Sequence, residues 1–257
     1  MTALIRIQEE IFTNEQFVNY LKFSNEFQAL MEGFIEKRII LREAKEKGIS
    51  LTETEIQQAS DDFRRCMGLH RVSDTQKWLD ENGLTLNEFE VFIKEFLLSG
   101  KMMATIINKE NMENYFRQHA PRFDTVDICR IVIRGENKAR ELMLLLCEEP
   151  EKFAAFAKKY SLDEETRDIG GYVRGLCRDM MNEDMEARLF HAEEGEIMGP
   201  FHISNSDIYE IIRIAARKPA TMEDAAVREK VAESLRKEWV EKHRENLIIE
   251  GGSSWKN

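Results

Sequence analysis

Residues 151–201 constrain the fold more than any other part of the chain. The segment begins with EKFAAFAKKYS, runs through an acidic loop and a pair of glycines, and ends with ARLFHAEEGEIMGPF. Apolar residues at three- and four-residue steps predict two helices, and Gly170 and Gly171 predict a turn between them. The Gly199-Pro200 pair comes just before a predicted strand.

Runs of branched apolar residues on both sides of this segment predict strands. The run TVDICRIVI at residues 125–133 precedes it, and GPFHIS followed by DIYEIIRIAA predicts a closing antiparallel pair. A further short strand is predicted at residues 172–173, with helices at residues 137–147, 151–160 and 183–190. The sequence therefore predicts an α+β domain over residues 124–216.

The first part of the chain, residues 1–120, is predicted to form a mainly helical domain. Three pairs of residues have the spacing of a capping box, in which a hydroxyl and a side chain three residues later satisfy backbone N–H groups at a helix start. These pairs are Thr52 with Glu55, Ser73 with Gln76, and Thr85 with Glu88.

A last helix is predicted over residues 222–249 because its apolar residues form one stripe. Val227, Val231, Leu235 and Trp239 recur at four-residue steps. Such a stripe needs an apolar surface to pack on, and we expect the N-terminal helices to supply it. Residues 250–257, GGSSWKN, are predicted to be a flexible tail.

The charge and residue composition exclude some classes of binding partner and of cofactor. The formal net charge of −11 disfavours nucleic acid and anionic lipid as partners. No stretch is long and apolar enough for a membrane span or a signal peptide, so a cytoplasmic location is expected if residue 1 is the natural start. The four cysteines and five histidines lack metal-ligand spacing, so we expect neither a metal nor a cofactor.

The order and spacing of these motifs over residues 127–216 resemble the parvulin (PpiC) family of peptidyl-prolyl isomerases. A helical region before such a domain, with a closing helix after it, resembles the layout of the SurA-like chaperones. The resemblance implies a four-stranded antiparallel sheet with helices. It also implies that the partner is an unfolded or extended, proline-containing client polypeptide, and that no cofactor is needed.

The two histidines of active parvulins stand on neighbouring central strands, and both are replaced here. Arg130 in ICRIVI and Glu210 in IYEII fall at the two histidine positions. These residues carry opposite charges, so we expect them to form an ion pair in the sheet. Such a pair, if buried, costs about 3–5 kcal/mol to break by removing one partner.

The resemblance also assigns residues around the substrate proline. Asp163 falls where the family carries an acid or a cysteine near the proline carbonyl, although it also fits a solvated loop acid. Met181, Met185 and Phe190 fall at positions that line the proline pocket, and plain core packing is the alternative for all three. The family motif GGDLG becomes GGYVR, with Tyr172 and Arg174 at two changed positions.

Three functions fit these residues. The first is a parvulin-like isomerase or foldase of weak activity, with Asp163, Arg130 and Glu210 at the catalytic positions. The second is a catalytically degenerate chaperone or peptide-binding maturation protein that uses the pocket only for binding. The third is an adaptor that uses the domain as an interaction surface, and exposed apolar surface on the helical half would suit a client or a homodimer equally.

Overall fold

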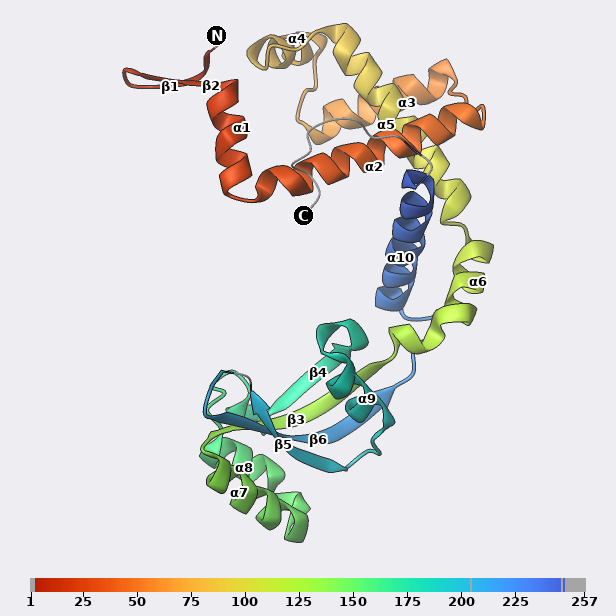
Figure 1. The fold of residues 1–257 in the computed structure, drawn as a ribbon. Helices are drawn as coiled ribbons and strands as arrows, with labels where there is room; N and C mark the ends of the chain where they lie inside the picture. The colour runs from red at the N-terminus through yellow and green to blue at the C-terminus, as the bar shows by residue number, and fades with distance from the viewer. Residues whose placement is uncertain (1–2, 204, 246, 248–257) are drawn as a thin grey trace. The chain divides into compact units, whose positions relative to one another are not determined.

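The structure is a computed structural model that describes residues 3–203, 205–245 and 247 (Figure 1). The chain forms two compact units, one made of Met1–Asn111 with Ala232–Asn257 and the other of Met112–Val231. Together they give the expected fold class, a helical region plus an α+β domain with a four-stranded antiparallel sheet. None of the helices in the described residues is both long and apolar enough to cross a membrane.

The first unit is mainly helical but begins with a strand pair. Its elements are β1 (Ala3–Ile7), β2 (Glu10–Thr13), α1 (Asn14–Phe23), α2 (Glu26–Glu46), α3 (Glu53–Cys66), α4 (Val72–Glu81) and α5 (Leu86–Ile106). The strands were not expected, because residues 1–120 were predicted as helices. Branched residues alternate along LIRI, and Gln8, at a φ of 54°, lets the chain reverse so that β1 pairs antiparallel with β2.

The helix starts agree with the capping boxes at two of three places. The Thr52 and Thr85 hydroxyls accept hydrogen bonds from the backbone N–H groups of Glu55 and Glu88, whose carboxylates accept in return. The expected box at Ser73 is wrong. Helix α4 begins earlier, since the carboxylate of Asp74 accepts from the backbone N–H of Arg71 at 3.0 Å and places Ser73 inside the helix.

Helix α6 (Lys109–His119) and a short 3-10 turn (Ala120–Phe123) lead to the α+β unit. Its main elements are β3 (Thr125–Arg134), α7 (Glu136–Glu148), α8 (Phe153–Tyr160), β4 (Tyr172–Cys177), α9 (Glu183–His191), β5 (Ile197–Ile203) and β6 (Ile208–Lys218). The spatial order is β4-β3-β6-β5 with every neighbouring pair antiparallel, so β3 and β6 are the central strands.

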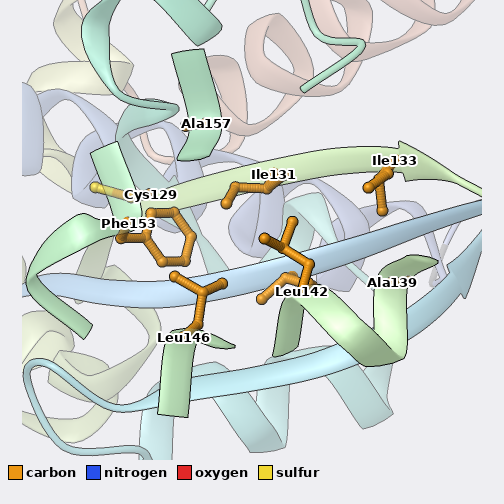
Figure 2. Close-up of a cluster of buried hydrophobic side chains, with 9 residues drawn as sticks. Cys129, Ile131, Ile133, Ala139, Leu142, Leu146, Phe153 and Ala157 are labelled. Carbon is orange, nitrogen blue, oxygen red and sulfur yellow. The ribbon is translucent and has the colours of Figure 1, made fainter. Parts of the chain in front are cut away.

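Each face of this sheet has its own core. Helices α7 and α8 cover one face, where Phe153, Leu146 and Ala139 pack on Ile131 and Ile211 without exposure (Figure 2). Helix α9 contributes to the other, where its residues Leu189 and Phe190 are buried with residues of the two central strands: Val126, Ile128, Ile212 and Ile214. Because side chains alternate along a strand, even-numbered residues of β6 belong to the α9 face.

The last helix, α10 (Ala225–Arg244), belongs to the first unit from Ala232 onward. In that unit Val240 is buried in one cluster with Ile39, Ile40, Ala44, Met102 and Ile106. Arg244 donates two hydrogen bonds to the Glu32 carboxylate of α2, which adds a charged contact at the edge of this core. The predicted tail, residues 250–257, lies outside the described residues.

Candidate functional site

The two charged residues at the expected histidine positions lie on the α9 face of the sheet. In the register of β3 and β6, Arg130 is opposite Ile212 and Glu210 is opposite Val132. Arg130 and Glu210 are therefore diagonal neighbours on one face, a separation that long side chains can span. Nη1 of Arg130 lies 3.8 Å from Oε1 of Glu210, an ion pair without a hydrogen bond.

Arg130 makes its closer contacts with Asp163 in the loop after α8. Its Nε and Nη2 atoms both lie 2.8 Å from Oδ2 of Asp163. The loop is fixed to β3 just beyond Arg130, because Leu162 donates its N–H to the carbonyl of Val132 and the buried hydroxyl of Ser161 accepts from the Val132 N–H. The structure thus brings Arg130, Asp163 and Glu210 into one charged cluster.

The pKa values of the two carboxyl groups in this cluster are shifted in opposite directions. Burial opposes ionisation of Asp163, but hydrogen bonds from the Thr166 hydroxyl and from Arg130 outweigh it and hold the pKa of Asp163 below its usual value. Burial raises the pKa of Glu210, because the attraction of Arg130 offsets only part of that burial and Asp163 repels a second negative charge. Asp163 is therefore the main ionic partner of Arg130, and Glu210 is the weaker one.

Gly171 allows β4 to approach Arg130 closely. Its φ of 78° lies in the left-handed region, and a Cβ built there would stand 2.1 Å from the Arg130 carbonyl oxygen. The Arg130 N–H donates to the Gly171 carbonyl at 2.8 Å, so the glycine holds the strand segment that carries the cluster. At the changed positions beyond it, the Tyr172 hydroxyl donates to the buried carboxylate of Asp127.

A cavity of 490 Å³ lies between α9 and β5, within the size range of small-ligand sites, and none of the three cluster residues lines it. Its apolar wall includes Met185 of α9 and Met198 and Phe201 of β5. Phe201 is opposite Glu210 in the sheet register, and Met198 is opposite Ile212, the residue that also pairs with Arg130. Two residues of the cavity wall are thus next to the charged cluster in the sheet, and Asn182, Asp184, Arg188 and His202 add polar groups to the rest of the wall.

Of the three residues predicted to line the proline pocket, the structure places one at the cavity and two in the core of the same face. Met185 lines the cavity, whereas Met181 and Phe190 are not among its lining residues. Phe190 is buried in the core of this face, with the Arg178 guanidinium 4.0 Å from its ring centroid. Met181 is half-buried and packs against the same core.

Of the residues that line the cavity, sequence reasoning assigned only Met185 to the pocket, and it missed Met198, Phe201 and Arg188 among others. Met198 and Phe201 flank the Gly199-Pro200 pair, where the register of β5 against β6 shifts, and Arg188 follows Met185 by one helical turn. The glycine and proline were expected at the start of a strand, and the structure places both inside β5. Which flanking side chains face the cavity depends on that register shift, which a strict alternation does not predict.

Another cavity lies in the helical unit, away from this cluster. A cavity of 520 Å³ in the helical unit is lined by residues of α3, α4 and α5, among them Ile56, Leu79 and Phe89. Within the described residues, no group of three His, Cys, Asp or Glu side chains is placed to hold a metal ion.

Comparison with known proteins gives the family of the α+β unit. Residues 134–216 match the family model of the rotamase, or PPIC-type PPIase, domain. This match includes Asp163 and Glu210, and it begins just after Arg130.

Longer matches extend to foldases. The foldase protein PrsA of Caldanaerobacter subterraneus subsp. tengcongensis is 22% identical over 265 residues, covering 96% of this chain and 78% of that protein. Foldase protein PrsA 2 of Listeria monocytogenes is 30% identical over 145 residues, covering 56% of this chain and 47% of that protein.

A solved structure is similar in fold over nearly the whole length of this chain. The peptidylprolyl isomerase PrsA from Bacillus cereus has a TM-score of 0.50 at 17% identity, covering 99% of this chain and 95% of that one. At this identity the likeness establishes the fold. The chain therefore contains a PpiC-type parvulin domain within a PrsA-like fold that has a helical N-terminal region.

Proposed function

We propose that this protein is a foldase that binds proline-containing segments of a client polypeptide and accelerates their X-Pro isomerisation weakly. The observation that supports the proposal is a cavity whose wall residue Phe201 is opposite Glu210 of the Arg130–Asp163–Glu210 cluster in the sheet register. The named relatives are foldases, and the rotamase domain matches the α+β unit.

The chemistry needs no cofactor and no covalent step. Amide resonance sets a barrier of about 18–20 kcal/mol to rotation about a peptide bond. A protein lowers that barrier by binding the twisted amide more tightly than either planar isomer. An apolar cavity that holds the prolyl ring and a polar group that follows the carbonyl oxygen as it rotates are sufficient.

Arg130 is the residue that we assign to the carbonyl oxygen. Asp163 binds its Nε and Nη2 atoms, which fixes the plane of the guanidinium, while Nη1 has only the 3.8 Å contact with Glu210. The Nη1 donors can therefore reach a substrate carbonyl, and Asp163 acts as a positioning residue. Stabilisation by this group is weak because the neighbouring carboxylates already neutralise its charge.

The second candidate is a peptide-binding chaperone that uses the same cavity without isomerisation. The observation that favours it is the engagement of Arg130 by two carboxylates, which reduces its attraction for a carbonyl oxygen. Both candidates require that a proline peptide binds at Met185, and they differ only in the exchange rate.

One measurement tests both. A peptide containing Ala-Pro, titrated into the ¹³C-methyl-methionine protein, should shift the Met185 and Met198 signals, and exchange spectroscopy should show faster cis–trans interconversion. Arg130→Ala should keep the binding and reduce the exchange, whereas Leu144→Ala, at an exposed position on α7, should change neither. Binding without faster exchange would leave the chaperone, and absence of binding would contradict both.

A further inference from the structure

Arg188 forms part of the cavity wall on the side of β5. It lies one helical turn after Met185 on α9, so both side chains project from the same face of that helix. Its guanidinium carbon is 5.7 Å from the centroid of the Phe201 ring, within the range of a cation–π contact. The contact with the ring leaves the N–H donors of the guanidinium for other partners.

Within the described ranges, these donors have no partner. Among the residues that the structure describes, none forms a hydrogen bond or an ion pair with the exposed Arg188 side chain. The other arginines of this region are engaged: Arg130 binds Asp163, and Arg178 binds the Glu186 carboxylate and the Pro121 carbonyl. Arg188 is thus a cation at the cavity edge that can bind a ligand without losing an internal contact.

The position of Arg188 relative to the charged cluster gives the direction of a bound segment. In the strand order β3-β6-β5, Arg130 is followed by Glu210 and then by Phe201, whose ring Arg188 contacts. With the prolyl ring on Met185 and Phe201, a preceding carbonyl that faces Arg130 directs the residue after proline toward Arg188. This order rests on the proposed function, which assigns the carbonyl to Arg130.

We infer that Arg188 is a specificity-determining residue that selects client segments in which an acidic residue directly follows the proline. The planar guanidinium matches the two oxygens of a carboxylate, and hydrogen bonds between charged groups are stronger than neutral ones. The acidic side chain then pairs with Arg188 while the proline occupies the apolar wall.

Asp184 lines the same cavity one turn before Arg188 and carries the opposite charge. Its carboxylate forms no ion pair with Arg188 within 4.0 Å, so it repels an incoming carboxylate from the same cavity edge without occupying the arginine. Removing each charge should therefore change the preference for acidic segments in opposite directions.

The test compares two peptides blocked at both ends, Ala-Ala-Pro-Glu-Ala and Ala-Ala-Pro-Gln-Ala, by NMR titration of the full chain. We expect the Glu peptide to bind about fivefold more tightly at low salt, the size of a well-placed exposed ion pair. Arg188→Gln should abolish that difference, Arg188→Lys should keep part of it, and Asp184→Asn should enlarge it. Arg140→Gln removes the same charge from α7 on the opposite face and should leave the difference unchanged.

The outcomes separate this inference from the function on which it rests. Equal binding of the two peptides would overturn the role of Arg188 and leave the foldase proposal intact. A third blocked peptide of the same length, Ala-Glu-Pro-Ala-Ala, carries the acid before the proline, and its tighter binding than Ala-Ala-Pro-Glu-Ala would overturn the direction of the bound segment. Failure of both peptides to bind would remove the proposed function together with this inference.

Discussion

Arg130 and Glu210 lie one diagonal step apart on the two central strands, with Nη1 of Arg130 3.8 Å from Oε1 of Glu210. The arginine nevertheless forms its hydrogen bonds with Asp163, at 2.8 Å. Arg130 therefore interacts with two carboxylates, which differ in their distance from the guanidinium and in the direction of their pKa shift. Substitutions of Asp163 and of Glu210 should for this reason have different effects on stability.

Asp163→Ala should destabilise the α+β unit, because it removes the hydrogen-bonded partner of a partly buried guanidinium. The expected loss is about 1.5–3 kcal/mol in the free energy of unfolding, the range for hydrogen bonds to charged groups. Glu210→Gln should change stability by less than about 1 kcal/mol, because its contact with Arg130 is longer. Urea unfolding at pH 7 measures both, and a larger loss for Glu210→Gln would contradict the assignment.

The pH dependence of stability should carry opposite signs for the two acids. The folded pKa of Glu210 lies above the ordinary 4.5, so the folded state binds the proton more tightly and stability falls as pH rises from 4.5 through the folded pKa. The folded pKa of Asp163 lies below the ordinary 3.8, so its contribution is complete above 3.8 and is lost as pH falls through the folded value.

Glu210→Gln isolates the first of these effects. The stability of the variant relative to the wild type should increase as pH rises above 4.5, since only the wild type must ionise a buried carboxyl group. Thermal unfolding at a series of pH values checks this, with Glu164→Gln, at an exposed loop position, as the control. A difference between Glu210→Gln and the wild type that does not vary with pH would exclude a raised pKa at Glu210.

Gly171→Ala should be more harmful than an alanine at another glycine of the same strand pair. Both Gly171 and Gly175 have positive φ, at 78° and 70°, so each substitution strains the backbone by about 1–2 kcal/mol. Only at Gly171 does the added Cβ meet backbone, the Arg130 carbonyl oxygen at 2.1 Å, whereas nothing lies within 4 Å at Gly175. Unfolding curves of the two variants should differ by more than about 1 kcal/mol. Equal curves would contradict the close approach.

Phe153→Ala should destabilise the core beneath the other sheet face. The ring is fully buried among Ile131, Leu146 and Ile211, and its removal leaves a cavity between α8 and the sheet (Figure 2). We expect a loss of about 3–5 kcal/mol. Leu144→Ala, which truncates an exposed side chain of α7, should stay within about 0.5 kcal/mol. Comparable losses for the two variants would mean that Phe153 is not part of this core.

Local signals explain why much of the fold could be predicted. The capping boxes at Thr52 and Thr85 are short-range hydrogen-bond patterns, so their residues carry the information without help from the rest of the chain. The N-terminal strand pair was missed because its apolar residues, such as Ile5 and Ile11, fit either element over so short a length.

The candidate site was only partly predictable, because its side chains come from three strands, one helix and one loop. The resemblance placed Arg130, Asp163, Glu210 and Met185 at functional positions. It did not reveal that Asp163 is the closer partner of Arg130, since the Ser161 and Leu162 hydrogen bonds to Val132 hold that loop in place.

The sequence by itself determined the fold class and most of the elements, although not the β1–β2 pair, because hydrophobic period, turn residues and helix caps act over a few residues. The tertiary structure decided which groups meet. The register of β3 against β6 set the Arg130–Glu210 diagonal, and the irregular pairing at Gly199 and Pro200 set Met198 and Phe201 on the cavity. Such contacts depend on how distant strands align, and a one-residue shift would move each side chain to the opposite face.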